Sequence, residues 1–368
     1  MNTPHSPNHE SAKEIAIVMQ SESTYKFCRR IGSLLLFVLT GSLLIPSAYG
    51  TSCSTGSQMS AAQRDTLSNT ARTMIGQVQS GDVQGLRANT IPAVAADFNG
   101  IATSAQTLKP HLQNATITVD NLYTFDTGTD QAGAQGIQFY CSPTGSNMTV
   151  VLNFPTIPSG KYAAVILHAT GIQKPQQISL VLSQSQPNQW KLAGFFYKPM
   201  LTAGHDGIWY WTQARQYSQN KMNWNAWFYY QNAAFLLDPV DFLSSPNLEK
   251  LRRETDQVHP ENLPSMKSMM LPAVGSSFEV TGMETTDELG GLDLVVYYNP
   301  NITQAGQLHD PVTARKQVID LMQAMLAVHP EFRSAFHGIW VRANQNGSSV
   351  FALELPMDQI TGSQSART

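Results

Sequence analysis

The sequence has 368 residues, a formal net charge of −3 at pH 7 and a charged fraction of only 13%. A balance so close to neutral excludes a protein that binds nucleic acid or an anionic membrane through a large basic surface. A chain of this length is expected to form about two domains, or one domain with additional elements.

The N-terminal part carries an apolar run, Ile31–Ile45, which follows Arg29-Arg30 and precedes small residues. A permanent membrane span needs about 20 mostly apolar residues, so this run is short for one. Positive charge, an apolar run and small residues are typical of a secretory signal. We therefore expect residues 1–50 to be a signal peptide that is cleaved after Gly50, with Met19 as an alternative true start.

Two other fates of this segment stay open. A lipid attachment at Cys53 would need an aliphatic residue three places earlier, where the chain has Gly50. A retained segment would leave the protein anchored to the membrane by its N-terminus. The expected location is the periplasm or the extracellular space, which share this export signal.

The remaining cysteines are expected to form a disulfide. Cys28 leaves with the signal peptide, so the mature chain keeps Cys53 and Cys141. An exported protein meets an oxidising compartment, where such a pair forms a disulfide. The alternative is two free thiols. Two cysteines without a CxxC motif cannot make a zinc site by themselves.

The mature chain begins with helices and continues with strands. Apolar residues at helical spacing cover residues 61–109, and Ser80-Gly81-Asp82 ends one helix and caps the next. From residue 115 the apolar period changes to two, which predicts a run of strands that begins near Ile117. Five further segments in this run show the strand pattern: Ile137–Cys141, Met148–Phe154, Tyr162–Ala169, Ile178–Ser183 and Trp190–Tyr197. Helices followed by hairpin-linked strands predict an α+β fold, with the helices on one face of a curved, mostly antiparallel sheet.

Two stretches, Thr73–Leu86 and Gln189–Phe195, resemble the first helix with its Gly-Asp break and the last strand of the NTF2-like superfamily. The resemblance covers residues 61–198 and implies a cone-shaped α+β domain within residues 51–200. Enzymes of this superfamily place an Asp, often with Tyr or His, inside the cone, but the strands of residues 134–197 carry no Asp or Glu. The candidate lining residues are Tyr123, Tyr140, Tyr162, His168 and Trp190.

Residues 204–258 are predicted to form an aromatic-rich helical hairpin and a covering helix. Between residues 206 and 239, small and aromatic residues resemble one tetratricopeptide-type hairpin in their spacing. Exposed aromatic patches often mark interfaces. The candidate binding aromatics are Trp209, Trp211, Trp224, Trp227 and Tyr230. The alternative is that they pack against neighbouring parts of the chain.

A proline-containing linker, residues 259–276, is expected to precede a small ββαββ unit at residues 277–360. Asp310 and the proline after it mark the start of its helix. Asn346-Gly347 is a strong two-residue turn signal between its last two strands.

The sequence contains no recognisable catalytic, nucleotide-binding or metal-binding motif. His205-Asp206 is the nearest polar pair, and Asp206 is expected to cap the aromatic helix. We therefore expect an exported, non-catalytic binding or scaffold module without a cofactor, whose partner is another protein, a peptide or a glycan. The alternative is an enzyme that acts on a small molecule in the cone.

Overall fold

The computed structural model describes residues 53–128, 136–145, 148–265 and 267–360, so the predicted signal peptide lies outside the described residues. The chain forms two compact units. Among the described residues, the first unit contains those up to Ile172, Gln177–Tyr197 and Val240–Ser245. The second contains Gln173–Gln176, Lys198–Pro239 and the described residues from Pro246 onward. In the described part of the chain, no helix has the length and apolar character that a membrane crossing requires.

After strand β1 (Cys53–Thr55), the first unit continues with helices whose ends follow local signals. They are η1 (Gly56–Gln58), α1 (Ala61–Ser80), α2 (Val83–Ala88), α3 (Pro92–Ala96), α4 (Asn99–Leu108) and η2 (Lys109–Leu112). The Ser60 side chain accepts a hydrogen bond from the Gln63 amide at the start of α1, and Gly81 ends this helix with φ of 79°. Asp82 then caps α2. The predicted break at Ser80-Gly81-Asp82 is confirmed, because only Gly adopts this positive φ without strain.

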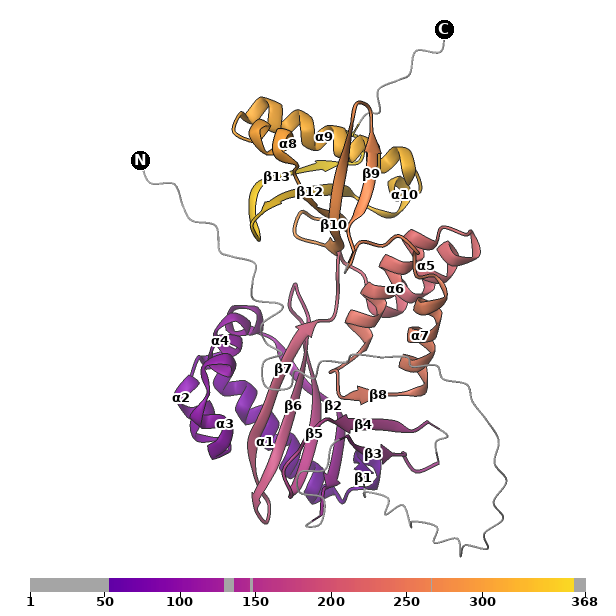
Figure 1. Cartoon of the computed structure of the whole chain (residues 1–368). Coiled ribbons are helices and arrows are strands. Elements are labelled where there is room, and N and C mark those ends of the chain that lie inside the picture. Colours follow the sequence, from indigo (N-terminus) through magenta and orange to yellow (C-terminus); the bar gives the residue numbers. More distant parts are fainter. Residues whose placement is uncertain (1–52, 129–135, 146–147, 266, 361–368) are drawn as a thin grey trace, which may run out of the picture. The chain divides into compact units, whose positions relative to one another are not determined.

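Two antiparallel sheets complete the first unit (Figure 1). The five-stranded sheet has the order β1-β2-β5-β6-β7 and the three-stranded sheet the order β3-β4-β8. Their strands are β1 (Cys53–Thr55), β2 (Thr116–Asp126), β3 (Ile137–Cys141), β4 (Val150–Phe154), β5 (Lys161–Thr170), β6 (Gln176–Gln186), β7 (Gln189–Pro199) and β8 (Leu243–Ser244). The strands predicted from apolar alternation therefore form where they were expected.

Alternation along β5 divides the core of the first unit into two layers. Ala163, Val165 and Leu167 face the helices and pack with α1 and α4. Tyr162 points to the opposite face, where its ring lies 5.7 Å from that of Phe125. Rings from β3 and β4 extend this second layer. Since side chains alternate along a strand, one sheet serves both layers.

A disulfide joins Cys53 of β1 to Cys141 of β3, as the sequence analysis predicted. The two residues are 88 positions apart. Because β1 pairs with β2 in the large sheet and β3 with β4 in the small one, the disulfide connects the two sheets. Its presence is consistent with an oxidising compartment.

The second unit contains the predicted helical hairpin. The helices of this unit are α5 (Gly207–Gln219), α6 (Asn223–Leu237), α7 (Pro246–Gln257), α8 (Ile302–Gln307), α9 (Pro311–Val328) and α10 (Phe332–Ala335), and α5 and α6 form the hairpin. Asp206 Oδ1 accepts from the Trp209 amide at 2.8 Å, so the expected capping role is confirmed. Asp310 caps α9 in the same way.

The C-terminal sheet is mixed and has the order β13-β12-β11-β10-β9. Its strands are β9 (Met269–Ala273), β10 (Ser276–Thr286), β11 (Asp293–Asn299), β12 (Gly338–Gln345) and β13 (Ser348–Pro356). β9 lies inside the stretch expected to be a linker and pairs with β10. The pair β11–β12 is parallel because α8, α9 and α10 connect its strands.

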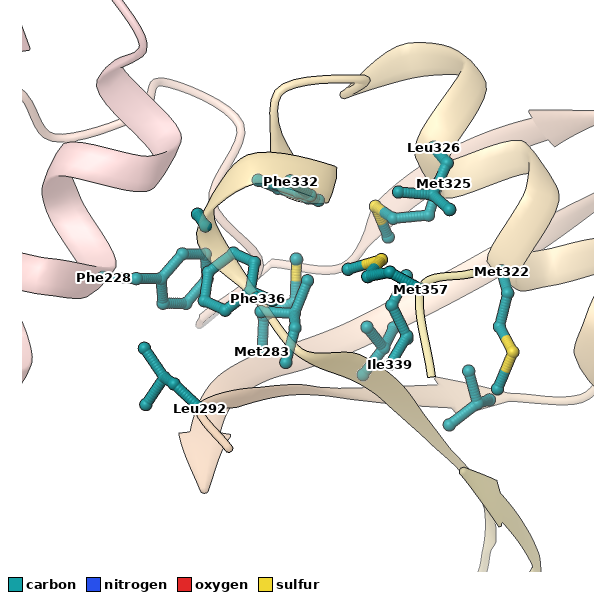
Figure 2. Close-up of a cluster of buried hydrophobic side chains, with 14 of the residues drawn as sticks. Phe228, Met283, Leu292, Met322, Met325, Leu326, Phe332, Phe336, Ile339 and Met357 are labelled. Carbon is teal, nitrogen blue, oxygen red and sulfur yellow. The ribbon is translucent and has the colours of Figure 1, made fainter. Parts of the chain in front are cut away.

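Helices α6 and α10 and the C-terminal sheet share one core (Figure 2). Figure 2 shows Phe228 beside Phe336, and their ring centres are 5.7 Å apart. Met283 of β10 and Ile339 of β12 belong to the same cluster. The aromatic hairpin thus packs against the C-terminal sheet within one unit. The expected α+β class, with N-terminal helices, a helical hairpin and antiparallel sheets, is confirmed.

Candidate functional sites

A polar groove of about 500 Å³ lies between helix α1 and the β6–β7 hairpin of the first unit. Its lining includes the buried Met74 and the half-buried Trp190. Lys191 is the charged residue of the lining, and the other groups are neutral: Thr66, Asn69, Thr70, Thr73, Asn89, Ser185, Asn188 and Gln189. The groove therefore combines an indole ring with many neutral donors and acceptors.

Part of this polar lining is already used inside the fold. The hydroxyls of Thr66 and Thr70 donate to backbone carbonyls of α1. The amide of Asn89 donates to Gln77 Oε1 at 3.3 Å. Four exposed side chains of the lining make no hydrogen bond within the described part of the chain: Asn69, Thr73, Asn188 and Gln189.

The edge of β7 beside this groove is covered by the segment after α2. The amide of Ile91 donates to the Leu192 carbonyl at 2.9 Å, and the Leu192 amide donates to the Asn89 carbonyl at 2.8 Å. Thr90 accordingly forms a parallel bridge with Leu192. These bonds occupy the backbone groups with which a peptide would extend the sheet at this point.

The five candidate cone residues do not come together. Tyr123, Tyr162 and His168 share the face of the sheet that points away from the helices, as their pairing on β2 and β5 requires. Trp190 packs on the helix side. Tyr140 lies on β3 of the other sheet and is 58% exposed. Strand register separates these residues, because neighbouring positions point to opposite faces.

In the described part of the chain, the side-chain hydrogen-bond partners of His168 and Tyr162 are uncharged. His168 Nε2 lies 3.4 Å from Gln177 Oε1, an amide oxygen. Burial raises the pKa of the Tyr162 hydroxyl, and a hydrogen bond with Ser183 lowers it by less. These contacts do not provide the carboxylate partner that acid–base chemistry would need here.

The candidate binding aromatics are half-buried or buried and pack against the core of the second unit. Trp209 stacks on His205 with ring centres 3.6 Å apart, and Trp224 lies 4.6 Å from the His329 ring. Trp211 donates to Glu254, as does the Tyr230 hydroxyl. Trp227 lies 5.9 Å from the ring of His259. Their role in binding a partner stays a prediction.

The hairpin also holds the short helix α10. The amide of Asn225 donates to the Glu331 carbonyl at 2.9 Å, and the hydroxyl of Tyr229 donates to the Ala335 carbonyl at 2.6 Å. Burial raises the pKa of Tyr229 far above its usual value. Two residues beyond Ala335, the chain reaches His337, which these contacts help to position.

His337 belongs to the group of potential metal ligands in the described part of the chain, together with Asp293 and Glu354. His337 Nδ1 lies 2.9 Å from Asp293 Oδ1. Burial raises the pKa of Asp293 despite the hydrogen bond with His337. Burial and the charge of Asp293 raise the pKa of Glu354.

Sequence reasoning missed both the groove and this cluster. Their residues come from distant segments and form no motif of fixed spacing. One signal was present, since Trp190 was a candidate residue of the first unit. For the cluster, an acidic residue inside each of two apolar strands, Asp293 and Glu354, was the available signal.

Comparison with known proteins adds no relative: no family model, no curated protein and no solved structure matches the chain significantly.

Proposed function

We propose that this protein is an exported, non-catalytic binding module whose first unit holds a neutral, hydroxyl-rich ligand, such as a short glycan, in the groove beside Trp190. The observation that carries the proposal is the chemistry of the lining, in which an indole ring and Met74 stand among neutral amides and hydroxyls. Amides and hydroxyls both donate and accept, as sugar hydroxyls do. A Trp ring offers a flat apolar face to the C–H face of a sugar.

A glycan fits this groove better than a peptide or a charged ligand. The Asn89–Ile91 segment occupies the β7 edge at which a peptide strand would add. A charged ligand would need charges of opposite sign, and the lining contains Lys191 alone. A ligand whose hydroxyls replace water on Asn69 and Gln189 avoids the cost of unpaired polar groups.

The finer assignments of fold and location belong to the same proposal. Helices on one face of an antiparallel sheet support an NTF2-like domain at residues 61–198. The packing of α5 against α6, which a three-residue turn connects, supports a tetratricopeptide-like hairpin at residues 206–239. The disulfide supports passage through an oxidising compartment, the periplasm or the exterior. An enzyme in the cone has less support, because the side-chain partner of His168 is the amide of Gln177 and not a carboxylate.

The binding proposal is tested by calorimetric titration of the mature chain with a panel of neutral oligosaccharides. The double variant Asn69→Ala/Gln189→Ala removes two exposed groups of the groove and is expected to weaken binding about tenfold or more. Gln186→Ala on the same hairpin lies outside the lining and is the matched control. Failure of every oligosaccharide to bind, or equal affinity of the double variant and the control, contradicts the proposal.

The export part is tested separately by the intact mass of protein recovered from its native source. A chain that begins at Thr51 supports a cleaved signal peptide. A mass that retains residues 1–50, or that carries a lipid on Cys53, contradicts it.

A further inference from the structure

We propose that Asp293, His337 and Glu354 form a binding site for a divalent transition-metal ion in the second unit. Asp293 is the first residue of β11, His337 directly precedes β12, and Glu354 lies on β13. These three strands are neighbours in the sheet. One ligand atom from each side chain lies within 4.8 Å of the others.

Two buried oxygens of this cluster lack a partner. Asp293 is fully buried, and its Oδ2 makes no hydrogen bond within the described part of the chain. Glu354 Oε1 is equally buried and unpaired there. An unsatisfied buried polar atom destabilises the fold, and more so when it carries charge. A cation between the two carboxylates would satisfy both oxygens.

Glycines make room for this arrangement. A Cβ at Gly338 would lie 2.7 Å from Glu354 Oε1 and 3.0 Å from Asp293 Oδ1, so both carboxylates face the space beside this residue. A Cβ at Gly291 would lie 2.4 Å from the Cβ of His337. Any larger residue at position 338 would fill the space between the carboxylates.

The charge of the cluster also favours a cation. Within the residues that the structure describes, no Lys or Arg side chain forms an ion pair with Asp293 or Glu354. The partner of Asp293 there is His337. The guanidinium of Arg342 lies 4.0 Å from the ring centre of Trp340. Two carboxylates therefore share one imidazole, and a divalent ion would balance their charge.

The ligand set indicates the class of ion. Imidazole nitrogen suits Zn²⁺ and related transition metals, whereas carboxylates alone suit Mg²⁺, Ca²⁺ and Mn²⁺. Three protein ligands leave a fourth position for water at a tetrahedral zinc ion. The His337 side chain is 46% exposed, so the site is open to solvent on this side. Zinc bonds of about 2.0–2.2 Å require small rotations of the three side chains, and neutral His337 would bind the ion through the ring nitrogen that carries no proton.

The test is calorimetric titration of the tag-free, chelator-treated mature chain with Zn²⁺. We expect one ion per chain, and affinity at least about tenfold weaker in Asp293→Asn and in Glu354→Gln. Asp320→Asn, which removes a surface carboxylate of α9 that pairs with Lys316, is the matched control and is expected to bind as the unaltered chain does. Mg²⁺ is expected to bind more weakly than Zn²⁺.

His337→Ala keeps the test decisive if the variants of buried Asp293 fail to fold, because the His337 side chain is exposed. It is expected to lose zinc affinity by a similar factor with an unchanged circular dichroism spectrum. No saturable zinc binding by the unaltered chain, or the same affinity in His337→Ala as in Asp320→Asn, would overturn the proposal. The three side chains would then form a proton-sharing structural network.

Discussion

Glu254 connects the helices of the hairpin to the covering helix α7. Its carboxylate accepts from Trp211 Nε1 at 2.7 Å and from Arg215 Nε at 2.8 Å, and the Tyr230 hydroxyl donates to it at 3.3 Å. Burial raises the pKa of Glu254, but hydrogen bonds from Arg215 and Trp211 and nearby positive charge outweigh it, so the pKa lies below its usual value. The resulting stabilisation is complete above the unfolded-state pKa and is lost as pH falls through the folded-state pKa.

We expect Glu254→Gln to lower the free energy of unfolding by about 1–3 kcal/mol at neutral pH, because charged hydrogen bonds become neutral ones. The difference from the unaltered chain should shrink as pH falls through the folded-state pKa of Glu254. Urea unfolding over an acid-to-neutral series measures both effects. Glu249→Gln removes a carboxylate of the same helix that is 48% exposed, and we expect a change within about 0.5 kcal/mol. Equal losses in the two variants would refute this account.

Helix α6 is the element on which the second core depends. Phe228 is 1% exposed and packs between α10 and the sheet, whereas Phe235, two turns later on the same helix, is 51% exposed. The same residue type thus occupies a core and a solvent position on one helix. Residues seven positions apart lie on nearly the same side of a helix, so it is the position along α6 that decides which phenylalanine is buried: Phe235 lies in the last turn and Phe228 in the middle of the helix.

Phe228→Ala is expected to lower the free energy of unfolding of the second unit by about 3–5 kcal/mol, since it leaves a cavity beside Phe336. Phe235→Ala is the matched control on α6, with an expected change below about 1 kcal/mol. Chemical denaturation followed by Trp fluorescence compares the two variants. A loss in Phe235→Ala as large as that in Phe228→Ala would show that this part of α6 is packed differently.

At the scale of the whole molecule, the disulfide acts on one of two units. Cys53 and Cys141 both belong to the first unit. A crosslink between positions 88 residues apart limits the freedom of the unfolded chain. Its stabilisation should therefore be confined to the unit that contains it.

We expect the variant Cys53→Ala/Cys141→Ala to lower the free energy of unfolding of the first unit by about 3–5 kcal/mol and to leave the second unit unchanged. Differential scanning calorimetry should then show the transition of the first unit moving to lower temperature, while that of the second unit stays in place. Reduction of the unaltered protein is the independent comparison and should have the same effect. A common shift of both transitions would mean that the two units unfold as one.

The sequence by itself determined most of the elements and several of their ends. The stop at Gly81, the caps at Asp206 and Asp310, and the turn at Asn346-Gly347 all appear in the structure where the residues predict them. Each of these signals acts through the backbone of residues at most four positions away. Apolar periodicity located the strands for the same reason, since it depends only on the local backbone repeat.

Only the tertiary structure decided which of these elements meet and which side chains share a face. Register placed Tyr162 and Trp190 on different sides of one sheet, and pairing with β10 made a strand of Met269–Ala273. Asp293 and Glu354 meet because a parallel and an antiparallel pairing bring β11 and β13 to either side of β12. Such pairings join residues far apart in the chain, so their energies depend on contacts that no local pattern contains.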